Sequence, residues 1–388
     1  MVPKLLVLSV SAGAGHVRAA EALVAAAHAR GWSAQHIDVM ELVPRLFRRL
    51  YAGSFITLVN RSPALWGYLY HASDVVGPDT YLARFRRAIE ELNTRRLARA
   101  VHQAEPTHIV CTHFLPAQLC ARLRAAGVVS APITTVVTDY DVHALWVQPG
   151  QAGFCVAAEE VAWRLDDRLA ALPGAPPVPP IAVTGIPIAS GFAAPPSRAE
   201  AAARFGIDAQ RTTLLLMSGA AGVGAMDKLA ERMLHVPGDF QIMALAGRNA
   251  PLLDRLGKIA ARFPGRLFPV GFTEVPEAAM AASDLAITKP GGLTTAECLA
   301  LGLPMLVVSP IPGQEERNSD YLLEHSAAMK AHDAAGVEYR VRRLLADPDR
   351  LARMRAAATA LGRPLAADAV LDQVMAASPS SSAPNPSV

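Results

Sequence analysis

The chain has 388 residues, of which 52% are hydrophobic, 18% charged and 6% aromatic. This length is too great for one comfortable hydrophobic core and suits two α/β domains, which implies a cleft between them. The composition is typical of a soluble globular protein and excludes fibrous and wholly disordered classes. A formal charge of +3 is too small to indicate a nucleic-acid binder.

The sequence predicts neither a membrane span nor a disulfide framework. The apolar run at the N-terminus ends at the glycine loop 12–15, too soon for a signal peptide, and predicts a buried strand. No other stretch reaches the ~18 apolar residues of a spanning helix, so any membrane contact is expected to be peripheral, at the cytoplasmic face. Four cysteines without paired spacing favour a reducing compartment, with no disulfide and no zinc.

The first half of the chain alternates strands and helices. LLVLSV predicts a buried parallel strand, SAGAGH a glycine turn, and the residues up to Gly31 a helix. Further strands are expected at 33–38, 106–113, 131–139 and 153–158. This alternation predicts a parallel sheet with helices on both faces.

A dense run of prolines between Leu172 and Pro196 marks the domain boundary, because proline is unsuited to a helix interior. Five more strands are expected, at 212–219, 240–247, 267–272, 285–292 and 304–310. We expect an N-terminal domain at 1–185, a linker at 186–210, a C-terminal domain at 211–376 and a disordered tail at 377–388. Whether the last helix packs back on the first domain stays open.

Three glycine loops each follow a predicted strand and open a helix: Gly13 to His16, Gly219 to Gly224, and Pro290 to Thr294. Glycine lets a helix N-terminus approach an anion closely. One such loop is often a matter of packing, but three in two domains favour a bound nucleotide. Neither GxGxxG nor GxxxxGK[ST] is present, and Asp38 matches a ribose-binding acid only loosely, so a hydride-transfer enzyme is disfavoured.

An ordered series of motifs covers most of the chain, from residue 9 to about residue 325: GAGH, TDYDVHALW, GIPI, the Gly219 loop, AGRN, TKPGGLTTAE and PIPGQEERN. In these motifs the sequence resembles the family 28 glycosyltransferases with the GT-B fold, most closely the monogalactosyldiacylglycerol synthase and processive diacylglycerol glucosyltransferase branch. The resemblance implies two Rossmann-like domains facing each other across a cleft, a UDP-sugar donor, and diacylglycerol or a glycolipid as acceptor.

The resemblance also implies roles for particular residues. Glu297 would bind the ribose hydroxyls of UDP, and Phe272 would present backbone groups to the uracil with Arg248 nearby. In the first loop, with Gly13 and Gly15, His16 would be the catalytic base, and His143 would lie near the sugar or diphosphate. The other donor-binding positions are Gly219, Gly222 and Gly224 at the diphosphate, Gly291, Gly292, Thr294 and Thr295 along the nucleotide, and Gln314 and Glu315 at the sugar hydroxyls.

Glu297 and His16 each have a plainer interpretation. Glu297 follows Thr294 by three residues, the spacing of a capping box that closes a helix end. His16 stands at a helix start, where histidine often serves only as a surface or capping residue. A helix N-terminus also disfavours imidazolium, however, so a histidine there stays neutral and able to accept a proton.

Asp139 and Asp141 have the spacing of a DxD metal motif, whose oxygen ligands would suit magnesium or manganese. We treat metal as the minor interpretation, because DxD sites belong to a different fold class and the helix-start loops already offer the diphosphate a binding site. The expectation is no metal and no cofactor other than the UDP-sugar itself.

The segment 43–76 mixes large apolar and aromatic residues with arginines, and residues 44–99 hold ten arginines against four carboxylates. A basic, aromatic-rich segment predicts contact with a membrane surface that contains anionic lipids. An interdomain or dimer patch is the alternative.

The predicted reaction is an inverting transfer of a hexose to a lipid hydroxyl, which yields a β-glycoside. Two other classes stay open: a UDP-sugar transferase with another lipid-linked or soluble acceptor, and a UDP-sugar epimerase or binding protein that transfers nothing. The sequence does not identify the sugar, because glucose and galactose differ in one hydroxyl orientation.

Overall fold

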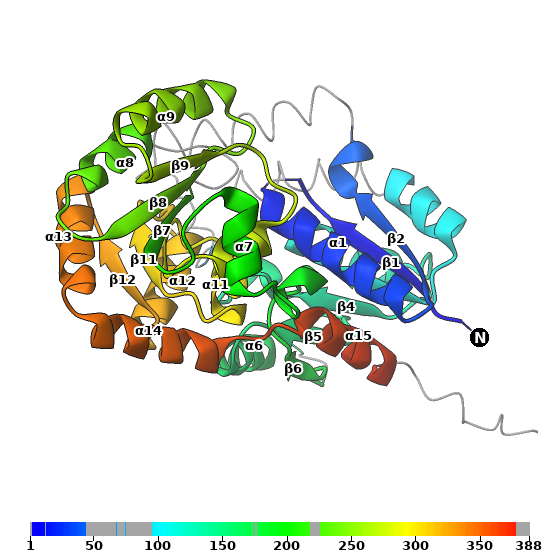
Figure 1. Ribbon diagram of the computed structural model, residues 1–388. Helices are drawn as coiled ribbons and strands as arrows, with labels where there is room; N and C mark the ends of the chain where they lie inside the picture. The colour runs from blue at the N-terminus through cyan, green and yellow to red at the C-terminus, as the bar shows by residue number, and fades with distance from the viewer. Residues whose placement is uncertain are drawn as a thin grey trace, which may run out of the picture.

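The computed structural model describes residues 2–11, 13–43, 67, 74, 95–172, 174, 177–217 and 226–377. Within these residues the chain forms two domains, each with a parallel sheet between helices, which lie side by side in Figure 1. The prediction of an α/β protein built from two Rossmann-like domains is confirmed.

The N-terminal sheet is parallel throughout. Its six strands are β1 (Lys4–Ser9), β2 (Ser33–Asp38), β3 (His108–Cys111), β4 (Ile133–Val136), β5 (Gly153–Val156) and β6 (Ile181–Val183), in the order β2-β1-β3-β4-β5-β6. Three of its helices are α1 (Ala14–Ala29), α5 (Phe114–Ala125) and α6 (Glu159–Ala170). Because β2 and β3 flank β1, the strand order reverses there, and such a reversal is where open α/β sheets bind ligands. The loop after β1 turns at Gly13, whose φ of 150° favours glycine.

The C-terminal sheet repeats this architecture. Its strands are β7 (Thr212–Met217), β8 (Phe240–Leu245), β9 (Leu267–Val270), β10 (Leu285–Thr288), β11 (Met305–Val308) and β12 (Ala328–Ala331), in the order β12-β11-β10-β7-β8-β9. Six of its helices are α8 (Met226–Leu234), α9 (Ala250–Arg262), α10 (Pro276–Ala281), α11 (Gly292–Ala300), α12 (Gln314–Glu324) and α13 (Ala334–Leu345). The order reverses between β7 and β10, so the loop from β10 to α11 lies at a second ligand crevice.

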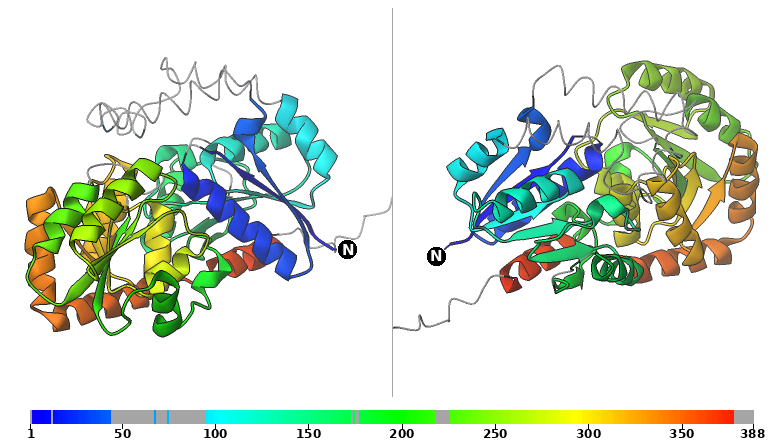
Figure 2. Two further views of the ribbon diagram at one scale, coloured as in Figure 1. Left: turned by 45° about the horizontal axis from the view of Figure 1, so that its top comes forward. Right: turned by 180° about the vertical axis from the view of Figure 1, so that it is seen from behind.

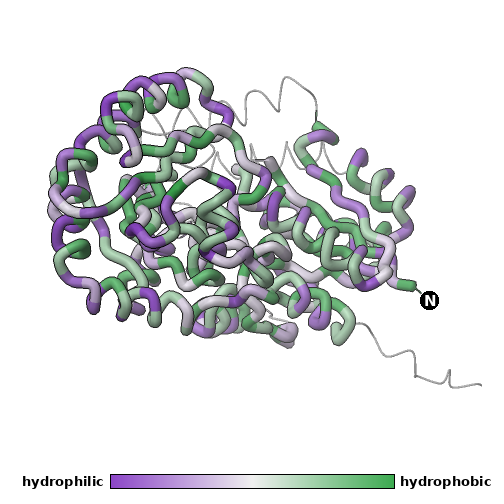
Figure 3. The backbone as a smooth tube through the Cα atoms, viewed as in Figure 1, coloured by the Kyte–Doolittle hydropathy of each residue, from purple (hydrophilic) through white to green (hydrophobic). Residues whose placement is uncertain are grey.

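Apolar side chains of the strands and of one face of each helix form the cores. Helix α9 shows the pattern. Leu252, Leu256 and Ile259 are buried at helical spacing, and hydrophilic residues alternate with them along the helix (Figure 3). Among the described ranges, every helix is too short or too polar to serve as a membrane span.

The chain returns to the N-terminal domain at its end. Helix α14 (Pro348–Leu361) covers the C-terminal domain, and α15 (Ala366–Ala376) packs against α1 and β5, as Figure 2 shows from two sides. Buried Val370, Leu371 and Val374 make this contact, and the Arg30 guanidinium adds hydrogen bonds to Asp368 at 3.0 Å and to Asp372 at 2.5 Å.

Three elements go beyond the sequence expectations. The edge strand β6 follows several prolines, which an edge strand tolerates, and β12 has the sequence AMKA, without β-branched or aromatic residues. Helix α7 (Arg198–Phe205) lies in the stretch expected as a linker, and a capping box of Ser197 and Glu200 starts it. The ten predicted strands all appear, shorter at several ends.

Candidate active site

The two domains touch at the carboxyl ends of their strands. A Cβ built on Gly15, at the start of α1, would lie 3.6 Å from the Cβ of Leu293 at the start of α11. A Cβ on Gly292 would overlap the carbonyl oxygen of Thr138, so glycine is what lets α11 approach the loop after β4 this closely. The GAGH, TDYDVHALW and TKPGG motifs, which are far apart in the sequence, therefore meet at one place.

His16 is held by threonines at the ends of two strands. Its Nδ1 lies 2.9 Å from the carbonyl oxygen of Thr112, after β3, and 2.9 Å from Oγ1 of Thr138, after β4. The Thr112 hydroxyl donates back to the His16 carbonyl at 2.9 Å. A carbonyl oxygen only accepts, so Nδ1 carries the proton and Nε2 is left as an acceptor. This is the tautomer that a general base needs.

The surroundings keep this imidazole neutral. Burial lowers the pKa of His16 to about 4, and the hydrogen bond to Thr112 opposes that effect only in part. The ring of His113 lies edge-on to it, with 4.6 Å between ring centroids, and burial together with His16 lowers the pKa of His113 as well. Nδ1 of His113 accepts from the Leu115 N–H at 3.1 Å and caps α5.

Glu297 forms an ion pair with the opposite domain. Nη2 of Arg18 in α1 lies 2.5 Å from Oε1 of Glu297 in α11, and only 2% of the Glu297 side chain is exposed. Burial raises the pKa of Glu297 to about 7, with Arg18 lowering it and Glu277 adding to the rise. The capping-box interpretation of Glu297 is wrong, because α11 starts at Gly292 with Gly291 as its N-cap and no side-chain cap.

Asn318 bridges the domains from α12. Its side chain is fully buried. Oδ1 accepts from the Tyr140 N–H at 2.8 Å, and Nδ2 donates to the Pro290 carbonyl oxygen at 3.0 Å. Both halves of one amide are therefore engaged, one with the loop after β4 and one with the loop after β10.

The two aspartates of the DxD spacing are engaged separately. The Asp141 carboxylate lies 3.2 Å from Arg164 and 3.2 Å from Arg317. Asp139 is half-buried, and its desolvation raises its pKa to about 6 although a hydrogen bond from Asn318 opposes the rise. Within the described ranges, no group of three or more His, Cys, Asp or Glu side chains is placed to hold a metal ion.

The side chain of His143 stabilises the loop after β4. Its Nδ1 accepts from the Leu145 N–H at 3.1 Å and caps the short helix η2 (Ala144–Trp146), while its Nε2 lies 4.0 Å from Oδ1 of Asp74. Asp74 also accepts from the Ala144 N–H and from Arg168, each at 2.7 Å. The role of His143 at the sugar or diphosphate stays a prediction.

The residues expected to bind the uracil and those expected to bind the sugar lie on different elements. The Arg248 guanidinium lies 4.4 Å from the ring centroid of Phe272, which is 55% exposed and so presents an accessible aromatic face. Glu315, next to Gln314 at the start of α12, accepts from the Ile311 N–H at 2.6 Å. Burial raises the pKa of Glu315, and Lys289 opposes the rise.

Thr294 is half-buried on α11. The neighbouring Thr295 is buried, and its hydroxyl has no hydrogen-bond partner among the described residues.

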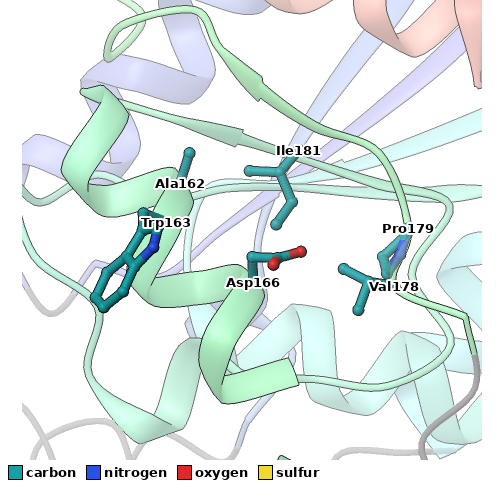
Figure 4. Close-up of a pocket in the computed structure, with 6 residues that line it drawn as sticks. All are labelled: Ala162, Trp163, Asp166, Val178, Pro179 and Ile181. Carbon is teal, nitrogen blue, oxygen red and sulfur yellow. The ribbon is translucent and has the colours of Figure 1, made fainter. Parts of the chain in front are cut away.

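Two cavities differ in their relation to these residues. One of about 570 Å³ lies at the carboxyl ends of β7, β10, β11 and β12, with Met217, Lys289 and Ser309 in its wall. The other, of about 370 Å³, lies between α6 and β6 around Trp163 (Figure 4), and no predicted site residue lines it. Gly219, Gly222 and Gly224 lie outside the described residues, as does the segment 43–76 apart from Val43, Gly67 and Asp74.

Sequence analysis did not identify Arg18, Thr112, His113 and Asn318 as site residues, nor Thr138 by its side chain. Thr112 and His113 are the last two residues of the strand predicted at 106–113 and directly follow the observed strand β3, and that position was the available signal, because sites of α/β proteins gather at carboxyl strand ends. The Arg18 and Asn318 contacts join residues 279 and 178 positions apart, which no local pattern reveals.

Comparisons with known proteins agree with this geometry. Residues 16–188 match the family model of monogalactosyldiacylglycerol (MGDG) synthase, and residues 241–370 match the glycosyltransferase family 28 C-terminal domain. The processive diacylglycerol beta-glucosyltransferase of Bacillus cereus (strain AH187) is 29% identical over 386 residues, which cover 96% of this chain and 94% of the relative. The same protein of Bacillus anthracis (strain CDC 684 / NRRL 3495) is 28% identical with the same coverage.

Solved structures share the fold. MurG of Acinetobacter baumannii superposes with a TM-score of 0.62 at 17% identity, covering 96% of this chain and all of the other. UGT2 of Phytolacca americana, complexed with UDP-2fluoro-glucose and pterostilbene, gives a TM-score of 0.61 at 15% identity, covering 96% and 99%. The chain therefore belongs to the family 28 glycosyltransferases with the GT-B fold, in the monogalactosyldiacylglycerol synthase and processive diacylglycerol glucosyltransferase branch.

Proposed function

We propose that the protein transfers a hexose from a UDP-sugar to the hydroxyl of diacylglycerol or of a glycosyl-diacylglycerol, with inversion to a β-glycoside. The relatives named as processive diacylglycerol beta-glucosyltransferases support this acceptor and this product. The single observation that carries the chemistry is the state of His16. It is neutral, its Nδ1 proton is engaged by Thr112, and it stands where the two domains meet.

The transfer is one displacement. The acceptor oxygen attacks the anomeric carbon of an α-linked UDP-sugar from the face opposite the diphosphate. The new C–O bond forms as the bond to the phosphate oxygen breaks, and that electron pair leaves with UDP. Nε2 of His16 takes the hydroxyl proton, a contribution of ~10²- to 10⁴-fold in rate.

The departing UDP gains negative charge, which needs compensation. The N-terminal amides of α11, at Gly291 and Gly292, and the predicted loop at Gly219 supply it, because unpaired N–H groups at a helix start stabilise anions. Arg248 adds a cation beside the expected uracil position. This arrangement needs no metal.

The donor test is calorimetry of UDP binding, followed by assay with labelled UDP-glucose and UDP-galactose on diacylglycerol liposomes and separation of products. Wild-type protein is expected to bind UDP in the calorimeter. In the assay it should form free UDP from a UDP-sugar only when diacylglycerol is present. Glu297→Ala should lose UDP affinity, and His16→Ala should bind UDP normally but transfer no sugar. Undiminished UDP binding by Glu297→Ala, or wild-type transfer by His16→Ala, contradicts the corresponding assignment.

The acceptor lies in a bilayer, so the protein is proposed to act peripherally at the cytoplasmic face through the segment 43–76, with anionic lipids attracting its arginines. Replacement of Arg45, Arg48 and Arg49 by Gln should reduce sedimentation with anionic vesicles and leave UDP affinity unchanged. Zwitterionic vesicles are the control. Equal sedimentation of variant and wild type would reject the segment as the membrane contact.

A further inference from the structure

The geometry points to Asn318 as a positioning residue that aligns the base with the donor: it fixes the loop that holds His16 to the loop that holds the nucleotide. The inference rests on the proposed function, in which His16 accepts the acceptor proton. It concerns a residue that touches neither the proton nor the sugar, and it explains how a base on one domain meets a donor on the other.

The side chain of Asn318 is held at both ends. It is fully buried, its Oδ1 accepts from the Tyr140 N–H at 2.8 Å, and its Nδ2 donates to the Pro290 carbonyl oxygen at 3.0 Å. Main-chain partners cannot swing away as side chains do. A buried amide with both ends engaged therefore sets the spacing of the two loops.

The loop that Asn318 holds is connected to the base. Two residues before Tyr140, the hydroxyl of Thr138 contacts Nδ1 of His16 at 2.9 Å, and the carbonyl of Thr138 is the group against which Gly292 packs. One short stretch thus contacts the base through a side chain and the nucleotide loop through its main chain. A shift of this loop away from α11 displaces His16 from the donor.

Removal of the amide has a definite expected result. Asn318→Ala leaves the Tyr140 N–H and the Pro290 carbonyl without their partner, so the distance between the two loops is no longer fixed. Because misplacement by about 1 Å costs up to ~10²-fold in rate, kcat should fall by about 10- to 100-fold. UDP affinity should change by less than about 3-fold, because Asn318 is not among the residues expected to bind UDP and its partners Tyr140 and Pro290 are main-chain groups.

Ser319→Ala is the matched control. Ser319 is the next residue of α12, is fully buried, and has a hydroxyl without a hydrogen-bond partner among the described residues. Its removal should leave kcat and UDP affinity at wild-type values. An equal loss of kcat in both variants would show that any change in this part of α12 disturbs the enzyme, and the inference would be rejected.

Asn318→Asp separates positioning from folding. The isosteric carboxyl keeps the acceptor for Tyr140 but offers the Pro290 carbonyl a hydrogen-bond donor only when it is protonated. Its kcat, relative to wild type, should therefore recover as the pH falls. Asp139, which accepts a hydrogen bond from Asn318, faces the same carboxyl, so the double variant Asp139→Asn/Asn318→Asp is measured beside it. Thermal unfolding at each pH separates this recovery from a folding defect, because a buried carboxylate also destabilises the fold until it is protonated. A second readout is the ¹⁵N shift of the His16 ring nitrogens: in Asn318→Ala the Nδ1 signal should move as the contact with Thr138 is disturbed, while the Thr112 carbonyl keeps the proton on Nδ1.

The outcomes are distinguishable. Wild-type protein without transfer, or active His16→Ala, refutes the proposed function. Active wild type and inactive His16→Ala, together with wild-type kcat in both Asn318→Ala and Asn318→Asp, refute the positioning role alone. A drop in kcat with unchanged UDP affinity, and pH-dependent recovery in Asn318→Asp, establish it.

Discussion

Arg18 of the N-terminal domain and Glu297 of the C-terminal domain form a 2.5 Å ion pair across the active site. The pair is uneven, because 40% of the Arg18 side chain is exposed while Glu297 is almost fully buried. A buried carboxylate without a partner would be costly and would take up a proton instead. Arg18 therefore sustains the ionised form of the residue expected to accept hydrogen bonds from the ribose.

The first prediction concerns the pH dependence of donor binding. The pKa of Glu297 is raised to about 7, so the carboxyl is largely protonated below that pH and largely ionised above it. Two ribose hydroxyls can both donate only to the ionised form. UDP-glucose affinity should therefore rise as the pH rises through about 7, approaching ~10-fold per pH unit on the acid side.

Calorimetry from pH 5.5 to 9 measures this dependence. UDP-glucose is the suitable ligand, because both phosphates are esterified and do not titrate in this range. Glu297→Gln is the control and should bind weakly with no pH dependence. An affinity of wild type that stays constant across pH 7 would contradict the role of Glu297.

The second prediction follows from the opposing effect of Arg18 on the same pKa. Arg18→Met removes the cation and keeps much of the apolar stem, so the pKa of Glu297 should rise further. The midpoint of the pH dependence of UDP-glucose affinity should then move above 7, with weaker binding at neutral pH and recovery in alkali. Arg18→Lys keeps the charge and should shift the midpoint less. A lower midpoint in Arg18→Met would overturn the argument.

Much of this site could be predicted from the sequence, because the loops that form it directly follow predicted strands. The glycine loops at Gly13 and Gly291 follow apolar strands, and the strand order brings both to ligand crevices. What local patterns cannot supply is the pairing between domains. Arg18 looks like an ordinary exposed helix residue until α11 is placed beside it.

The start of α11 is an example of what a local pattern supplies. The loop from Pro290 to Thr294 was expected to open a helix, and α11 begins at Gly292, while the alternative capping box of Thr294 and Glu297 does not form. The strand β12 was missed because its pairing with β11 compensates for residues of low β-propensity.

The third prediction compares two adjacent glycines. A Cβ on Gly291 would meet only Oε1 of Glu315, at 3.9 Å, whereas a Cβ on Gly292 would overlap the Thr138 carbonyl. Gly291→Ala should therefore leave the contact between the domains intact and keep a near-wild-type kcat, with any loss confined to KM for the UDP-sugar, since Gly291 is expected to line the nucleotide. Gly292→Ala must push α11 off the loop, at ~1–3 kcal/mol for overpacking, or about 5- to 150-fold in the population of the closed arrangement.

Steady-state kinetics and thermal unfolding of both variants test this comparison. Gly292→Ala should lose kcat while its C-terminal domain stays folded, because the clash lies between domains and not within one core. Similar activity of the two variants would show that the domains do not need this contact during transfer.

The last prediction separates the base from the donor site by pH. The pKa of His16 is lowered to about 4, chiefly by burial, so His16 is unprotonated over the whole range from pH 5 to 8. At saturating UDP-sugar, kcat reports the ionisation of the complex, while kcat/KM for the donor reports the free enzyme. We expect kcat to stay flat from pH 8 down to about 5, whereas kcat/KM for UDP-sugar falls below pH 7 with Glu297. Glu297→Gln should remove the fall in kcat/KM and leave the kcat profile unchanged. A fall in kcat centred near pH 6.5, the value of a solvated histidine, that persists in Asp139→Asn would mean that the base is not this partly buried imidazole.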